Sequence, residues 1–451
     1  MRYDLNDLTL CMLETDDVVV RHLIDVGMSA TEAEAKRARF STAATTLIAA
    51  GHARSESAVA VFVPGRIEIF GKHTDYCGGR SLLCVVERGQ CFVAVGQDRE
   101  HVRFFAVDLH EQADLSPTIV PDVAASHWSH YPSNVVRRIA RNFPGVFGGA
   151  DIAMSSDLPK ASGLSSSSAM IVGTFMVLAS LHKLSSHAIY ARNLPDRESL
   201  AGYLGTIENG QSFGEFAGDR GVGTFGGSQD HTAILGCRPG HVSVYSFCPV
   251  RHHSDLPLAA GMTFVVADSG VIAEKTGDAN AKYNSLSAGV RDIVSLWRDA
   301  NGTGDSLNEI LNSSPDALSR MREIIQRECP QDAPVLLDRV EQFVIESNNL
   351  IPRAADAFAR SDWEALRSIA SQSHQYADTH LRNQTPQTNA LQRALLENGA
   401  IAASAFGAGF GGSVWGLFDE RGLARWRESD VASQVPWFPT RPGCAATLIG
   451  G

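Results

Sequence analysis

The stretch Pro159-Lys160-Ala161-Ser162-Gly163-Leu164-Ser165-Ser166-Ser167-Ser168-Ala169 indicates the fold class, because it combines a phosphate-binding loop with the start of a helix. Gly163 allows a backbone conformation in which successive N–H groups converge on one anion. The serines supply hydroxyl donors and an N-cap, and the helix N-terminus adds about half a positive charge. The sequence GxxxxGK[ST] is absent, so this is not the common P-loop. An ordinary serine-rich capping loop would share these features, so the other motifs must decide.

The composition is that of an ordinary globular protein. A chain of 451 residues exceeds one typical core, which predicts two or three domains. Hydrophobic residues make up 44% and charged residues 20%. The formal net charge of −11 disfavours nucleic acid or an anionic membrane as the main partner, although an acidic protein can still hold a basic pocket.

Cysteine usage and the N-terminal sequence predict a cytoplasmic protein. The eight cysteines include no CxxC pair, so we expect reduced thiols. Residues 1–30 are rich in acidic side chains and lack the apolar core of a signal peptide. The apolar stretches are shorter than the ~20 residues that span a bilayer, so we expect no membrane insertion.

Residue patterns predict a helical extension followed by two mixed α and β domains. Residues 17–50 have helical spacing, and Val59–Val63 is a β-branched run that we expect to end at the Pro64-Gly65 turn. The region between Pro249 and Pro257 is the expected domain boundary. The predicted parts are a helical N-terminal extension (1–55), an N-terminal domain (56–250) and a C-terminal domain (251–451).

Three further loops carry polar or glycine-rich motifs. Residues 64–79 place Arg, Lys, His and Asp between glycines, which fits either a polar surface turn or a binding loop. In the glycine-rich loop 223–231, Asp230 precedes an apolar run, so it could cap a helix or act as a general base. The GxGxxG pattern at 407–412 lies too near the C-terminus, and too far from a first βαβ unit, to indicate dinucleotide binding.

In this order, the loops near 65–79, 159–169 and 407–413 resemble those of the GHMP small-molecule kinases, named for galactokinase, homoserine kinase, mevalonate kinase and phosphomevalonate kinase. The galactokinase signature Gly-Arg-x-Asn-x-Ile-Gly-Glu-His-Thr-Asp-Tyr-x-x-Gly aligns with Gly65 to Gly79. The resemblance covers about residues 58–418 and includes Trp128, Tyr131 and Ser373-His374. It implies an α+β, two-domain GHMP kinase fold with the active site in the cleft between the domains, and ATP and Mg²⁺ as cofactors.

The resemblance also implies residue roles. Asp230 would be the catalytic carboxylate, with Arg66 beside it. A sugar hydroxyl is a poor nucleophile, so a carboxylate must orient it and accept its proton, and a nearby guanidinium keeps that carboxylate ionised. The residues implied for ATP binding are Pro159, Gly163, Leu164, Ser165, Ser166, Ser167 and Ser168; those for the metal are Ser167 (or a neighbour) and Glu208; those for the sugar are Lys72, His73, Asp75, Tyr76, Gly227 and Tyr283.

The chain departs from the galactokinase pattern at several positions. Glu68 replaces Asn, and Lys72 replaces the Glu that reaches toward the hydroxymethyl group of galactose. Lysine cannot accept a hydrogen bond but can pair with a carboxylate, so Lys72 either contacts a uronic acid or pairs with Glu68 or another acid of the protein. Residues 209–224 form an insertion that we expect to be a flexible flap over the sugar site. His231 stands where the family has Gln.

These observations predict an ATP-dependent kinase that converts the anomeric hydroxyl of galactose or a related monosaccharide into a sugar 1-phosphate, with release of ADP. Two alternatives remain: a uronic acid (galacturonate) 1-kinase and a non-catalytic galactokinase-like sugar sensor. We expect a small-molecule sugar as partner, no nucleic acid or membrane, and a monomer or weak homodimer.

Overall fold

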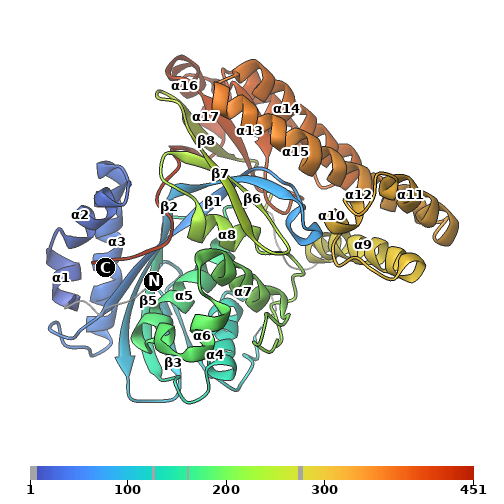
Figure 1. The fold of residues 1–451 in the computed structure, drawn as a ribbon. Coiled ribbons are helices and arrows are strands. Elements are labelled where there is room, and N and C mark those ends of the chain that lie inside the picture. The colour runs from blue at the N-terminus through green and yellow to red at the C-terminus, as the bar shows by residue number, and fades with distance from the viewer. Residues whose placement is uncertain (1–7, 124–126, 160–161, 273–277, 451) are drawn as a thin grey trace.

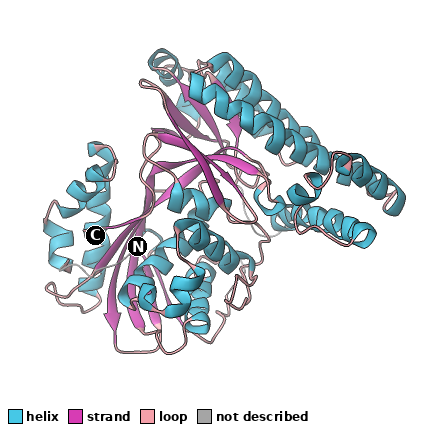
Figure 2. Ribbon diagram, viewed as in Figure 1, coloured by secondary structure: helices cyan, strands magenta, loops and turns pink. Residues whose placement is uncertain are grey.

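The structure is a computed structural model that describes residues 8–123, 127–159, 162–272 and 278–450. Figure 1 shows a layer of N-terminal helices beside a large sheet, and a second sheet that leads into a long helical arm. Figure 2 shows that helices pack along both sheets, as expected of a mixed α and β protein.

The N-terminal helices cover one face of the large sheet. On α3, Phe40 and Leu47 are fully buried and pack in one cluster with Phe62 and Val93 of the sheet. These apolar contacts attach the extension to the domain that follows it. The helices of this layer are α1 (Leu10–Thr15), α2 (Val18–Asp25) and α3 (Ala30–Ala49).

The large sheet has the order β12-β1-β2-β5-β3-β4, and β6 and β7 extend it beside the first part of β2. Its pairs are antiparallel except for β3 with β5. The strands are β1 (Val59–Phe70), β2 (Arg80–Gln97), β3 (Val102–Ala106), β4 (Glu111–Leu115), β5 (Gly149–Ser156), β6 (His241–Ser246), β7 (Arg251–Pro257) and β12 (Thr447–Leu448). The helices are η1 (Asp75–Cys77), η2 (Val107–Leu109), α4 (His130–Asn142), α5 (Ser166–Leu181), η3 (Leu184–Ser186), α6 (Ala188–Asn193), α7 (Arg197–Asn209) and α8 (Gln229–Gly236).

Strand β1 does not end at the Pro64-Gly65 turn, so that prediction is wrong. The strand continues to Phe70, and its register against β2 shifts between Pro64 and Arg66. An irregularity of this kind accommodates a proline, which has no N–H for the ladder. Gly65 is required because a Cβ there would lie 2.7 Å from the Leu158 side chain. As a result, Arg66 and the residues after it belong to a buried strand.

The second sheet has the order β11-β8-β10-β9 and carries most of the C-terminal helices. Its strands are β8 (Thr263–Asp268), β9 (Ala402–Ala405), β10 (Ser413–Phe418) and β11 (Trp437–Thr440). The helices are α9 (Asp278–Asn301), α10 (Leu307–Leu311), α11 (Ala317–Glu328), α12 (Ala333–Ile345), the π-helix η4 (Glu346–Leu350), α13 (Ile351–Arg360), α14 (Trp363–Tyr376), the π-helix η5 (Ala377–Leu381), α15 (Pro386–Glu397), α16 (Glu420–Arg427) and α17 (Asp430–Gln434).

Strand pairing differs from the predicted division at residue 250 in two places. Strand β7 pairs with β6, so the large sheet continues to Pro257. Strand β12 returns to β1, where Leu448 lies opposite Val61. The C-terminal domain is therefore the segment between β7 and β12, and the last residues of the chain complete the first sheet. The patterning missed this because β12 is only two residues long.

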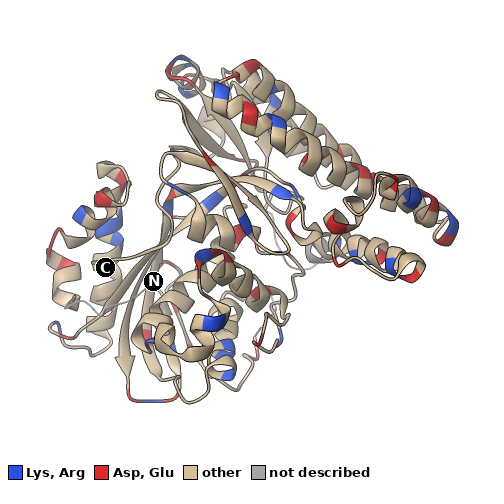
Figure 3. Cartoon of the chain, viewed as in Figure 1, with Lys and Arg blue, Asp and Glu red and all other residues tan. Residues whose placement is uncertain are grey.

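Charges of both signs are spread along the helical arm formed by α9 to α12 (Figure 3). None of the helices in the described part of the chain is long and apolar enough to cross a membrane.

Candidate active site

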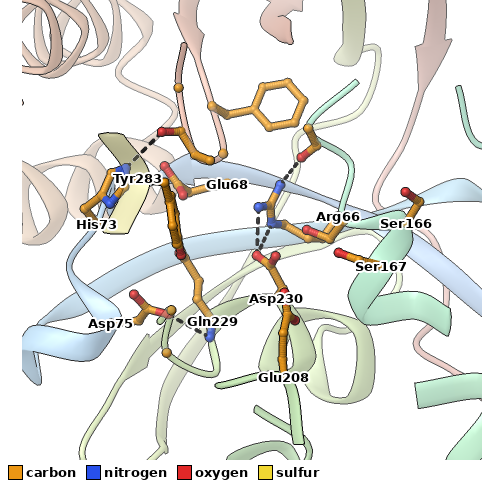
Figure 4. Close-up of a pocket in the computed structure, with 18 of the residues that line it drawn as sticks. Arg66, Glu68, His73, Asp75, Ser166, Ser167, Glu208, Gln229, Asp230 and Tyr283 are labelled. Atoms are coloured by element: carbon orange, nitrogen blue, oxygen red, sulfur yellow. Dashed lines mark hydrogen bonds and ion pairs between the residues drawn. The ribbon is translucent and has the colours of Figure 1, made fainter. Parts of the chain in front are cut away.

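A cavity of about 330 Å³ is lined by residues of both domains. Its walls come from β1, the turn after β1, the N-termini of α5 and α8, the end of α7, helix α9 and the loop between β9 and β10. Figure 4 shows the side chains of this pocket, with Arg66 and Glu68 both projecting from β1. The predicted binding residues that line the pocket are Gly163, Ser165, Ser166, Ser167, His73, Asp75, Tyr76, Gly227 and Tyr283, together with Arg66, Glu208 and Asp230.

The serine-rich loop turns sharply before α5. Gly163 has φ +76° and Ser165 has φ +61°, and the helix begins at Ser166. The Ser165 side chain makes no capping hydrogen bond, so the predicted serine cap is not formed. Ser162 instead closes the loop by donating to the Pro159 carbonyl oxygen at 2.9 Å. Ser166 and Ser167 line the pocket at a helix N-terminus, which favours an anionic group.

Three loop residues predicted to bind ATP, Pro159, Leu164 and Ser168, are not among the residues that line the cavity. The Leu164 side chain is buried in the core, and its carbonyl oxygen accepts the Arg66 backbone N–H at 3.2 Å. Leu164 and Pro159 therefore support the loop through hydrogen bonds that their backbone carbonyl oxygens accept.

Arg66 connects the predicted catalytic carboxylate to the serine-rich loop. Its Nε and Nη2 lie 2.8 Å and 2.7 Å from Asp230 Oδ1. Its Nη1 donates to the Gly163 carbonyl oxygen at 2.5 Å. Asp230 stands in the first turn of α8, whose N-cap residue is Ser228, so the predicted alternative in which Asp230 caps this helix is wrong. Charge-assisted bonds of this kind hold the carboxylate in one orientation.

A cluster of oxygen donors lies beside Asp230. Ser168 Oγ is 3.1 Å from Glu208 Oε2 and 3.4 Å from Asp230 Oδ2. Thr224 donates to Glu208 Oε1 at 3.3 Å. Hydroxyl and carboxylate oxygens are the ligands that Mg²⁺ prefers, usually with only one or two protein carboxylates. The donor set fits this ion, with Ser168 rather than Ser167 in contact with Glu208.

The far end of the pocket is lined by polar groups with fixed orientations. Asp75 is buried and accepts the Gln229 backbone N–H at 3.2 Å. Burial raises the pKa of the Asp75 carboxyl. His73 Nε2 donates to the Ala408 carbonyl oxygen at 3.0 Å, which leaves Nδ1 to accept the Tyr76 hydroxyl at 2.9 Å. These contacts preorganise acceptors and rings for a polar ligand.

Glycine is required where the 223–231 loop passes this end of the pocket. A Cβ on Gly227 would lie 2.4 Å from Asp75 Oδ2, and one on Gly226 would lie 2.4 Å from the Tyr283 hydroxyl oxygen. The backbone of the loop can therefore approach the Asp75 carboxylate closely.

Three family profiles match in order along the chain: the galactokinase galactose-binding signature at residues 51–96, the N-terminal domain of GHMP kinases at 130–214, and the C-terminal domain of GHMP kinases at 354–429. The chain belongs to the GHMP kinase superfamily.

Galactokinases are among the proteins similar to this chain. The Chloroflexus aggregans galactokinase is 25% identical over 385 residues, which cover 84% of this chain and 88% of the relative. The Glaesserella parasuis galactokinase is 26% identical over 364 residues, covering 78% and 83%. The crystal structure of Lactococcus lactis galactokinase complexed with galactose superposes with a TM-score of 0.69 at 19% identity, covering 86% of this chain and 95% of that one, and shows the same fold. The protein is thus a galactokinase-like phosphotransferase, and GHMP kinases use ATP.

Lys72 of this GHMP kinase does not line the pocket, although it was predicted to bind the substrate. Its side chain is buried, and Nζ donates to Ser373 Oγ at 2.9 Å. Ser373 in turn donates to Glu346 Oε1 at 3.0 Å. Because β1 ends at Phe70, the strand alternation that placed residues 68 and 72 on one face does not reach Lys72. Of the predicted alternatives, the structure shows a link between Lys72 and an acid of the protein, Glu346, and this link runs through the Ser373 hydroxyl group.

The segment between α7 and α8 packs against the core, and no described residue of 209–224 lines the cavity, unlike the predicted flap over the sugar site. Phe216 is buried in the core, and Asp219 pairs with Arg137 of α4. Arg138 donates to the Gln211 carbonyl oxygen at 3.0 Å. The glycines of the segment, which suggested flexibility, instead allow distant parts of its own backbone to approach each other closely.

Sequence reasoning missed the residues that hold the turn after β1. Arg339 of α12 is buried, and Nη2 donates to the His73 carbonyl oxygen at 2.5 Å. Gln342 donates to the Lys72 carbonyl oxygen at 3.1 Å, and Glu346 Oε1 accepts the Gly71 N–H at 2.8 Å. A single arginine in an amphipathic helix gives no local signal for such a role, since its partners lie more than 260 residues away.

Proposed function

We propose that this protein is an ATP-dependent sugar 1-kinase, which transfers the γ-phosphoryl group of ATP to the anomeric hydroxyl of galactose or a related uncharged monosaccharide. The observation that carries the proposal is the position of Asp230. Its carboxylate is held by two nitrogens of Arg66, at the junction between the serine-rich loop and the sugar-binding turn.

In this proposal the side chains act mainly by positioning charge. Asp230 orients the sugar hydroxyl and accepts its proton as the new P–O bond forms and the bond to ADP breaks. Arg66 neutralises charge on Asp230 and on the phosphoryl group in transfer. Glu208 and Ser168 would hold Mg²⁺, which when bound neutralises charge on the phosphate oxygens.

The charge of the pocket favours an uncharged sugar over a uronic acid. Among the described residues that line the cavity, four carry carboxyl groups: Glu68, Asp75, Glu208 and Asp230. Arg66 is engaged with Asp230 and Gly163, and Lys72 lies outside the lining. A sugar carboxylate would therefore meet carboxyl groups, among them the ionised Asp230, without a free cation from these residues, which disfavours binding.

The test is ADP release from Mg·ATP with a panel of galactose, galactosamine, arabinose, fucose, glucuronate and galacturonate. We expect turnover with galactose or another neutral sugar, loss of turnover in Asp230→Asn, and no effect of Asp299→Asn, which removes an exposed carboxylate of α9. Turnover that survives Asp230→Asn would refute the role of Asp230. Sugar binding without ADP release from the wild type would refute the kinase and favour the sugar sensor.

A further inference from the structure

Glu68 is a carboxyl group of the pocket that the proposed reaction does not use. It projects from β1 two residues after Arg66, on the same face of the strand, and lines the cavity (Figure 4). Its side chain is almost fully buried. Within the described part of the chain, no hydrogen-bond partner is found for its buried Oε1 atom. A buried polar atom left unpaired destabilises the protein, so its presence in a pocket indicates a partner supplied by a ligand.

The neighbouring donors are already engaged and leave Glu68 to a ligand. All three contacts of the Arg66 guanidinium described above go to Asp230 and the Gly163 carbonyl group. Lys72, two residues after the end of β1, donates to Ser373 of α14. The Glu68 carboxyl group faces a cavity whose other polar walls include acceptors such as Asp75 and Asp230.

We propose that Glu68 is a sugar-recognition residue that donates a hydrogen bond to one hydroxyl group of an uncharged substrate and accepts one through its other oxygen. This inference rests on the proposed sugar-kinase function and specifies its substrate class. Each sugar hydroxyl both donates and accepts, so a neutral carboxylic acid can pair with it in the same way as an amide. An ionised substrate carboxylate has no proton to donate, so it cannot form this pair of hydrogen bonds with Glu68.

The surroundings of Glu68 favour the protonated acid. Burial raises its pKa to about 8, and the negative charges of Glu346 on η4 and Asp230 on α8 act in the same direction. Arg66 and Lys72, on and just after β1, act in the opposite direction. At neutral pH the carboxyl group is therefore mostly protonated, and it ionises as the pH rises through about 8.

The experiment measures galactose binding by calorimetry at pH 7 and pH 9, without nucleotide. Glu68→Gln keeps a donor and an acceptor without charge, whereas Glu68→Leu removes both, and Glu323→Gln changes an exposed glutamate of α11 as a matched control. At pH 7 we expect Glu68→Gln to bind within about threefold of wild type and Glu68→Leu at least tenfold more weakly. From pH 7 to pH 9 the wild type should lose roughly tenfold in affinity, and Glu68→Gln should not.

Several results would overturn the inference. Wild-type affinity in Glu68→Leu would show that the residue makes no contact with the sugar. Equal weakening in Glu68→Gln and Glu68→Leu, with a preference for galactosamine in the wild type, would show that an ionised carboxylate is needed. Folding is checked by thermal unfolding and by binding of a fluorescent ADP analogue, which Glu68 variants should retain.

The two proposals fail in different ways. Galactose that binds in a Glu68-dependent manner but is not phosphorylated would refute the kinase and leave the recognition role intact. Galactose that is phosphorylated with unchanged KM in Glu68→Leu would refute the recognition role and leave the kinase intact. Absence of both galactose binding and ADP release in the wild type would contradict both.

Discussion

The contacts of Arg66 make Arg66→Lys the most informative single substitution. The arginine forms two short contacts with Asp230 and one with the Gly163 carbonyl oxygen. A lysine keeps the positive charge but has only one side-chain nitrogen, so it can retain about one of these three contacts. Hydrogen bonds to charged groups contribute about 1.5–3 kcal/mol each, and losing two costs about 3–6 kcal/mol.

If these contacts are needed in the transition state, kcat should fall by about 10²–10⁴, since each 1.4 kcal/mol corresponds to about a tenfold change in rate. The assay is steady-state ADP release, with binding of a fluorescent ATP analogue as a measure of the intact nucleotide site. Arg360→Lys, at an exposed position of α13, is the control and should behave as wild type. A kcat of Arg66→Lys within about threefold of wild type would refute the reasoning, because a point charge would then suffice.

Three other substitutions test separate parts of the site. Gly227→Ala places a Cβ 2.4 Å from Asp75 Oδ2, so the sugar KM should rise at least tenfold with little change in the KM for ATP. The control is Gly289→Ala, whose Cβ makes an ordinary 3.5 Å contact. Equal sugar KM values in the two variants would contradict the steric argument. Glu208→Gln should raise the Mg²⁺ concentration needed for half-maximal ADP release, and an unchanged Mg²⁺ titration would exclude it as a ligand. Arg339→Met should lower the free energy of unfolding in urea by about 1–3 kcal/mol and raise the sugar KM more than it lowers kcat; a stability loss with normal KM would show that it does not position the turn.

Local chemistry explains which parts of the site were predictable. Gly163 and the serines after it form a contiguous motif, because phosphate binding at a helix N-terminus depends on neighbouring backbone groups. Asp230 and Arg66 were predictable only from the order of several motifs. The sequence between them contains no local pattern from which contact between the two side chains could be predicted.

Long-range packing explains what the sequence did not predict. The orientation of Lys72 depends on where β1 ends and on Ser373, about 300 positions later in the chain. The same is true of Arg339, whose buried guanidinium binds the turn after β1. In the anchored segment between α7 and α8, a composition typical of flexible loops was overridden by Arg138 and Phe216, which fix it to the core.

The return of the chain to the first sheet has a consequence for synthesis. Val61 and Phe62 of β1 pair with Leu448 and Thr447, and His22 of α2 lies 3.0 Å from the Thr447 hydroxyl oxygen. During translation, the edge of β1 that receives these last residues stays open until the whole C-terminal domain has emerged from the ribosome. An exposed strand edge is a template for wrong pairing, so nascent chains and C-terminally shortened products should be the aggregation-prone forms of this protein.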